Sequence, residues 1–137
     1  MSVLSVSLSG MAAATARLNV SAQNVANSLT SGALPDAPAF KAGAPTPYQP
    51  QQLVQFSLGA QQGGGVTTRI RAQPDGVQTG YDPGASYANA QGMVAMPNVD
   101  LGVETVNQIQ ALQQFKANLK VFEAGDDMLK TALNLRA

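Results

Sequence analysis

Apolar residues recur at helical spacing along the first thirty residues of the chain. They follow one another at alternating steps of four and three, which is the a/d seam of a heptad: Leu4, Leu8, Met11, Thr15, Leu18, Ala22, Val25 and Leu29. This regularity predicts an amphipathic helix. Ser2 or Ser5 can cap its start, and the weak helix formers Ser31 and Gly32 follow its end. We therefore expect residues 1–30 to form an N-terminal helix.

A second apolar pattern begins after Pro97 and continues almost to residue 137. Its members keep to steps of three or four, or to twice that, apart from a gap opposite Asp126. They are Val99, Val103, Val106, Ile109, Leu112, Phe115, Leu119, Phe122, Leu129 and Leu133. Residues 98–137 are thus predicted to form a C-terminal helix.

The start of this second helix carries its own signals. We expect Asn98 to act as the N-cap by accepting a hydrogen bond from the Leu101 N–H. Asp100 and Glu104 then complement the positive end of the helix dipole. A bend or break is expected near Gly125, because glycine costs roughly 1 kcal/mol relative to alanine inside a helix.

Residues 31–97 lack a helical period. Prolines at 35, 38, 45, 47 and 50 favour an extended or loosely ordered connection. The β-like runs 52–58 and 66–72 are separated by glycines and predict a small hairpin or sheet. Residues 73–92, with further prolines and glycines, are predicted as loops. The predicted fold is mainly α with a small β-rich middle.

The amino-acid composition restricts the possible functions of the chain more than it restricts the possible folds. Charged residues make up 12% of the 137 residues and the net charge is zero, so nothing favours nucleic acid or an anionic membrane surface as a partner. Cysteine and histidine are absent, which removes thiolate metal sites and the commonest catalytic base. We expect no catalytic residue, metal, cofactor or small-molecule substrate. We also expect no membrane span and no cleaved signal peptide.

Two lone helices make a poor core for a chain of this length, because isolated helices are marginal in water. We therefore expect the terminal helices to pair as a coiled-coil hairpin that is disordered or partly ordered outside a larger assembly. The predicted assembly interface consists of Leu4, Leu8, Met11, Leu18 and Val25, together with the second apolar pattern from Val99 to Leu133. Uncharged amides such as Asn24 and Gln114 occupy other helix faces, where they can be buried if they are paired.

Two motifs resemble a known family. The stretch "ARLNVSAQNVANSLTSG" (residues 16–32) resembles the N-terminal signature of bacterial flagellar axial proteins, with matches at Arg17, Leu18, Asn24, Ala26, Asn27 and Thr30. Residues 80–135 resemble the C-terminal half of proximal rod proteins of the flagellar basal body. The matches include a Tyr-Asp-Pro-Gly element at 81–84 and then Pro97, Asn98, Val99, Asp100, Glu104, Phe115, Ala117 and Asn118. Methionine at 93, glutamine at 113 and phenylalanine at 115 depart from the family's usual residues.

The resemblance implies a structural role. Members of this family are exported unfolded through the flagellar type III apparatus without a cleaved signal. They assemble in the periplasm, beside other rod subunits and copies of themselves, into a helical tube that transmits torque between motor and hook. Their terminal helices form the inner layer of that tube.

Other hypotheses stay open from the residues alone. One is a rod subunit of another type, FlgB- or FlgG-like. A second is a coiled-coil adaptor or export chaperone, and a third is a small enzyme or ligand-binding domain within residues 31–92. The adjacent Asp126 and Asp127 favour a solvated helix face, and Arg69 with Arg71 favour an exposed strand edge rather than a phosphate site.

Overall fold

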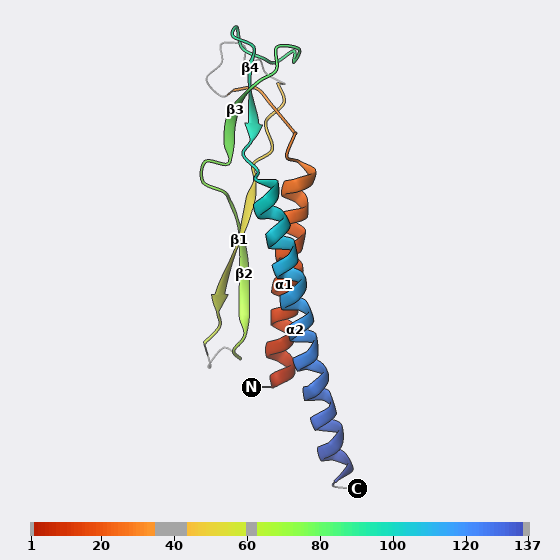
Figure 1. Ribbon diagram of the computed structural model, residues 1–137. Coiled ribbons are helices and arrows are strands. Elements are labelled where there is room, and N and C mark those ends of the chain that lie inside the picture. The colour runs from red at the N-terminus through yellow and green to blue at the C-terminus, as the bar shows by residue number, and fades with distance from the viewer. Residues whose placement is uncertain (1, 35–43, 60–62, 136–137) are drawn as a thin grey trace.

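The computed structural model describes residues 2–34, 44–59 and 63–135, and part of the predicted proline-rich connection lies outside them. Within these ranges the elements are α1 (Val3–Ala26), β1 (Gln51–Ser57), β2 (Val66–Ala72), β3 (Val77–Tyr81), β4 (Met93–Pro97) and α2 (Leu101–Asn134). The two helices run side by side in opposite directions, and the strands form two antiparallel pairs (Figure 1). The molecule is elongated, with the β3–β4 pair at the end where α1 finishes and α2 starts.

Helix α1 begins where the sequence predicts. The Ser2 hydroxyl accepts a hydrogen bond from the Leu4 N–H at 3.3 Å and so caps the first turn. The helix ends at Ala26, and the N–H of Asn27 donates to the Gln23 carbonyl at 3.0 Å. The predicted helix is confirmed, although it stops short of residue 30.

The predicted cap of α2 is wrong. Asp100, not Asn98, is the N-cap, and its Oδ1 accepts from the N–H groups of Gly102 at 2.8 Å and Val103 at 3.1 Å. A carboxylate there satisfies free N–H groups and complements the helix dipole. Asn98 is held elsewhere, because its N–H donates to Gly76 O and its Nδ2 donates to Asp75 O. The helix therefore starts at Leu101, three residues later than predicted.

Helix α2 runs unbroken through Gly125, so no break occurs there. A Cβ at this position would lie 3.1 Å from Leu4 Cδ2 of α1. Glycine therefore permits a close approach of the two helices here.

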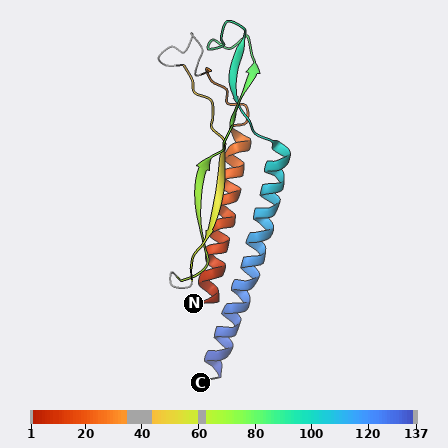
Figure 2. The same cartoon turned by 90° about the vertical axis from the view of Figure 1, so that its left-hand side faces the viewer.

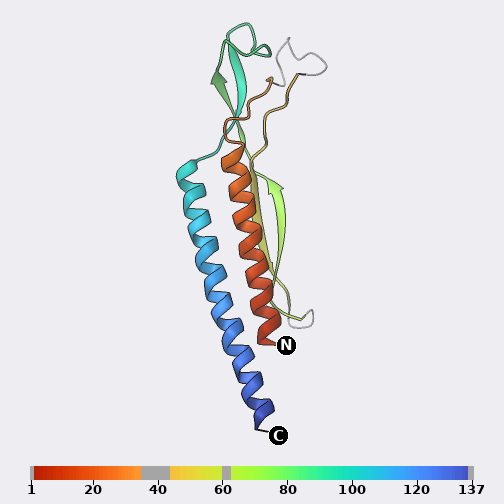
Figure 3. The same ribbon diagram turned by 90° about the vertical axis from the view of Figure 1, so that its right-hand side faces the viewer.

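Strands β1 and β2 form the predicted hairpin, with Leu53 opposite Ile70. This hairpin lies along α1, on the side away from α2 (Figures 2 and 3). Strands β3 and β4 were not predicted, and the expectation of loops fails for Val77–Tyr81. Gly80 interrupts the pattern of side chains that would have indicated a strand here. In the structure, the space beside Gly80 is filled by the side chain of Met96 from the paired strand β4.

The two helices meet mainly through small and polar side chains, although Leu4 of the predicted apolar seam also lies against α2, at Gly125. On α1 the contact stripe also has steps of three and four, with the residues Ser7, Gly10, Ala14, Arg17, Ser21 and Asn24. On α2 it recurs every seventh residue, at Glu104, Ala111, Asn118 and Gly125. The predicted pairing of the terminal helices is present, but most of the predicted apolar seam does not lie between them.

Candidate assembly surface

Most of the predicted interface residues lie on the surface of the folded chain. The exposed members are Leu8, Leu18, Val25, Val103, Val106, Ile109, Leu112, Phe115, Leu129 and Leu133. Leu4, Met11, Val99, Leu119 and Phe122 are half-buried. Scattered exposed leucines are ordinary in monomers, whereas many large apolar side chains exposed along two adjacent helices are typical of surfaces that bind other proteins.

One face of the helix pair carries an apolar groove of about 200 Å³. We call it the leucine groove, and it is lined by Ala14, Thr15, Leu18, Ala111, Leu112 and Phe115. Its floor is buried, because Ala14 and Ala111 are 1% and 2% exposed. Its rims are the larger side chains of Leu18, Leu112 and Phe115, which are 40%, 47% and 37% exposed. Small residues at the floor and large ones at the rims suit the insertion of a side chain from another helix.

The last turns of α2 have no partner among the described residues. Figure 1 shows α2 continuing past the start of α1. Residues 126–135 extend about 15 Å at about 1.5 Å per residue. Met128, Leu129, Leu133 and Leu135 on this segment are between 50% and 83% exposed. Asp126 and Lys130 form an ion pair on this segment.

A buried polar cluster joins the two helices to the middle segment. We call it the Asn24 junction, comprising Asn24, Tyr48, Gln51 and Glu104. Asn24 Nδ2 donates to Gln51 O at 2.8 Å and to Glu104 Oε1 at 2.7 Å. Its Oδ1 accepts from the Gln51 N–H at 2.9 Å and from the Tyr48 hydroxyl at 3.0 Å. Asn24 is 1% exposed, so this amide is buried with every polar atom paired.

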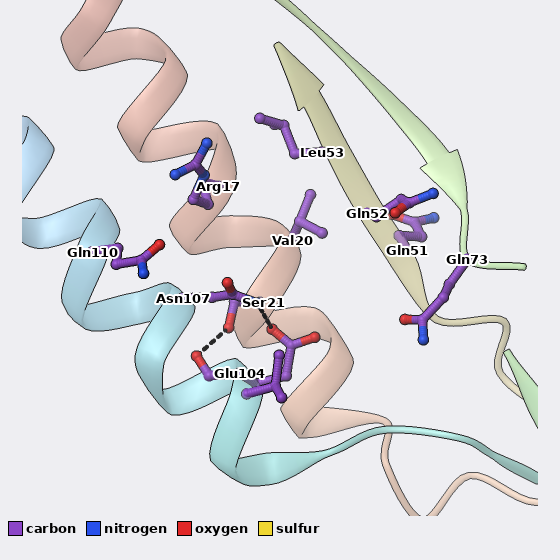
Figure 4. A pocket seen from close by; sticks show the side chains of 11 residues that line it. Arg17, Val20, Ser21, Gln51, Gln52, Leu53, Gln73, Glu104, Asn107 and Gln110 are labelled. Atoms are coloured by element: carbon purple, nitrogen blue, oxygen red, sulfur yellow. Dashed lines mark hydrogen bonds between the residues drawn. The ribbon is translucent and has the colours of Figure 1, made fainter.

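Glu104 is held in place by its neighbours on both helices (Figure 4). Its Oε2 accepts from Asn107 Nδ2 at 3.2 Å, and its backbone carbonyl accepts from the Ser21 hydroxyl at 3.0 Å. The carboxyl is 8% exposed, and amides stabilise it rather than a cation. Burial, and secondarily the Glu104 carboxylate, raise the pKa of Tyr48.

Arg17 links three elements beside this junction. Its Nη2 donates to Gln55 Oε1 of β1 at 2.6 Å, and its Nη1 donates to Gln114 Oε1 of α2 at 3.2 Å. Together with Glu104, Arg17 lines a largely polar groove of about 490 Å³ between the helices and β1 (Figure 4).

The structure brings together some of the motif residues and separates others. Asn24 and Glu104 meet in the junction, although they are 80 positions apart in the sequence. Asn27 and Thr30 bond to each other at the end of α1, at 3.4 Å. Pro97 is the last residue of β4. The remaining motif residues, Ala26, Phe115, Ala117 and Asn118, lie along the helices, where only Asn118 is not exposed.

Sequence reasoning missed Ser21, Tyr48, Gln51 and Asn107 as members of this polar cluster. A signal was present for the helix contact, because small and polar residues on α1 keep the same alternating spacing as the leucines. No local sequence pattern pointed to Tyr48 or Gln51, because they lie at the end of the proline-rich connection, where apolar residues do not recur at regular spacing.

Comparisons with known proteins agree with this geometry. Residues 90–135 match the family model described as the C-terminal part of the flagellar basal body rod proteins FlgEFG. Over 98% of this chain and 96% of the relative, the sequence is 34% identical to a flagellar basal-body rod protein FlgC from Yersinia enterocolitica. It is 35% identical, with the same coverage, to the protein of that name from Salmonella typhimurium. The corresponding protein of Agrobacterium fabrum is 30% identical over 93% of this chain and 88% of its own length.

Proposed function

The chain belongs to the FlgC family of flagellar basal-body rod proteins and is a structural subunit of that rod, and from this premise we propose that it assembles through the exposed apolar faces of α1 and α2. Because its relatives are structural rod proteins, the chain is not an enzyme. The third hypothesis, an enzyme or ligand-binding domain in residues 31–92, is therefore dropped.

One observation carries the assembly proposal. Most of the predicted apolar seam is exposed, including Leu8, Leu18 and Val25, whereas mainly small and polar side chains hold the helix pair together. A chain that functioned alone would gain more stability by turning these leucines inward. Large apolar side chains along α1 and α2 instead remain available to helices of other subunits.

The finer features of the role are likewise proposals. We place the subunit in the proximal rod, on the periplasmic side, with other rod subunits and copies of itself as neighbours in a helical tube. Export in an unfolded state through the flagellar type III apparatus, without a cleaved signal, suits a chain whose core is small. The paired helices would transmit torque between motor and hook along their length.

The length and composition of α1 also meet the minimum for a membrane span. Val3–Ala26 is long and apolar enough to cross a membrane, with a mean hydropathy of 1.2 over its best window. Its polar stripe argues against that role, because Arg17, Ser21 and Asn24 all bond to α2 or to β1. We propose that α1 lies along α2 in the rod and not in a bilayer.

The proposed function is tested in a strain that lacks this protein. Its absence should abolish motility and leave basal bodies without complete rods in electron micrographs, and expression of the full chain should restore both. Complete rods in the deletion strain would refute the assembly role. A tight, discrete dimer of the purified chain, found by sedimentation, would favour the adaptor or chaperone instead.

A further inference from the structure

We propose that the open edge of β1 accepts an extended segment of a neighbouring rod subunit, which adds a third strand to the β1–β2 sheet. The inference rests on the proposed function, because the added strand comes from a neighbour in the rod. Strand β1 pairs with β2 along one edge only. Its other edge borders the polar groove between the helices and β1, since Gln51, Gln52 and Leu53 all line that groove (Figure 4).

The hydrogen bonds at the two ends of β1 show which backbone groups lie on the open edge. Before the strand, Pro50 O accepts from the Gln73 N–H at 2.7 Å. After it, the Leu58 N–H donates to Gly65 O at 2.9 Å. Backbone groups point to alternate edges along an antiparallel strand. Even-numbered residues of β1 therefore direct their N–H and C=O groups toward β2, and odd-numbered residues direct theirs toward the open edge.

Asn24 already occupies the first position of this edge in the manner of a strand. Its side-chain amide donates to Gln51 O at 2.8 Å and accepts from the Gln51 N–H at 2.9 Å. A residue in a paired strand exchanges the same two bonds with the residue opposite it. The next outward positions are Leu53 and Gln55, whose backbone N–H and C=O groups bond to no residue in the described part of the chain. They lie about 6.8 Å apart, which is the repeat of a second strand.

The composition of β1 does not oppose pairing at this edge. Natural sheets protect exposed edges with charged side chains, with proline or with very short strands. Strand β1 has seven residues, and none of them is charged or proline. Strand β2 carries Arg69 and Arg71. The open edge of β1, rather than that of β2, therefore suits an added strand.

The chemistry of the groove favours an uncharged polypeptide segment as its occupant. The guanidinium of Arg17 already donates to two glutamines, and both carboxylate oxygens of Glu104 already accept from asparagines. Three further amides line the groove without a side-chain hydrogen bond to any described residue, namely Gln52, Gln73 and Gln110. Each amide both donates and accepts, so these side chains match peptide groups and uncharged polar side chains.

Photo-crosslinking in assembled rods tests the added strand directly. p-Benzoylphenylalanine at Gln52, an exposed position, would lie about 5 Å from the facing residue of an added strand. The same probe at Arg71, which is opposite Gln52 on β2 and also exposed, would lie one strand further away, at about 10 Å. After irradiation of purified basal bodies, we expect the probe at Gln52 to capture a peptide of another subunit at least about tenfold more than the probe at Arg71. Mass spectrometry identifies the captured peptide.

A proline substitution tests whether the backbone carries the contact. Leu53→Pro removes an N–H on the open edge and no bond to β2, so the hairpin is retained. Leu53→Ala is the matched control, because it also shortens the side chain but keeps the N–H. Complete rods per cell in electron micrographs should be at least about tenfold fewer with Leu53→Pro than with Leu53→Ala. Should Leu53→Pro prevent folding, the crosslinking still decides, because the β1 backbone is intact in that chain.

Three results would overturn the added strand. The first is a Gln52 probe that gives no adduct larger than the chain itself, or an adduct with a glycan and no second polypeptide. The second is equal capture of one peptide from Gln52 and Arg71, because the neighbour would then cover the face of the sheet and not its edge. The third is an equal number of rods with Leu53→Pro and Leu53→Ala.

Failure of the added strand is distinguishable from failure of the proposed function. The crosslinking is read in basal bodies that contain the chain, so a missing adduct there overturns the added strand and leaves the role in the rod standing. Absence of the chain from purified basal bodies would refute both.

Discussion

A charge placed in the leucine groove should block assembly and spare the fold. Leu18→Asp puts a carboxylate on the rim of that groove, where Leu18 is 40% exposed in the free chain. Asn19→Asp adds the same charge at the next position of α1, about 100° around the helix, where the side chain is exposed. The two variants therefore differ in the face that carries the charge and not in net charge.

The exposed fraction of Leu18 sets the size of the two effects. Complete burial of a leucine stabilises by about 1.5 to 3 kcal/mol, so the 60% already buried contributes about 1 to 2 kcal/mol to the free chain. Leu18→Asp should lower the free energy of unfolding by about that amount. In the assembly, an uncompensated buried charge costs about 3 to 5 kcal/mol, which weakens each contact by about two to nearly four orders of magnitude.

Three measurements separate these effects. Denaturant unfolding of the purified variants gives the stability of the free chain. Immunoblots of the culture medium show whether the variant is still exported. Soft-agar motility and electron micrographs of basal bodies report assembly. We expect Leu18→Asp to be exported but to form no rods, and Asn19→Asp to resemble the parent. Normal rods with Leu18→Asp, or equal failure of both variants, would refute the placement of the interface.

Three other predictions follow from the structure. Replacing Leu129 and Leu133 together by serine should lower the unfolding free energy by about 1 to 2.5 kcal/mol, in proportion to their buried fractions, yet should abolish rods in the same micrographs. Gly10→Val should destabilise the helix pair by about 1 to 3 kcal/mol in denaturant unfolding, because a Cβ at this position would overlap the side chain of Asn118. The raised pKa of Tyr48 contributes stability that is present below its unfolded pKa of about 10. This contribution is lost as the pH rises through the folded pKa. The free energy of unfolding, measured from about pH 9 to 11, should therefore fall more steeply in the parent than in Tyr48→Phe. Equal slopes would show that the hydroxyl is not sequestered.

Local signals in the sequence were enough for the elements with strong periods. The heptad spacing predicted α1, with Ser2 as one of two possible caps, and the β-like runs predicted the β1–β2 hairpin. The β3–β4 pair was not predicted from the sequence, because the contacts that stabilise it come from residues distant in sequence. Gly32 exchanges backbone hydrogen bonds with Ala95, which is fully buried, and no local pattern reports such a pairing.

The position of α2's start and the role of Gly125 also depend on tertiary context. Asn98 and Asp100 are both good caps by residue type, and the choice between them was decided by the loop at Gly76, which takes the backbone N–H of Asn98. Glycine in a helix predicts a weak point until another helix is known to approach it. Leu4 makes that approach at Gly125.

Periodicity could not decide which stripe of α1 faces its own chain, because both stripes have the same spacing. Polar chemistry does decide the register of the helix pair. A slide of α2 by one heptad would set Ala111 where Glu104 now meets Asn24, and both the amide and the carboxylate would lose their bonds. Contacts between alanine and glycine alone would tolerate such a slide. A polar pair buried between two helices does not tolerate it, because it fits in one register only. One register of α1 and α2 places Leu18 beside Leu112 and Phe115 in the leucine groove. The buried polar pair thus determines the shape of the apolar surface that assembly uses.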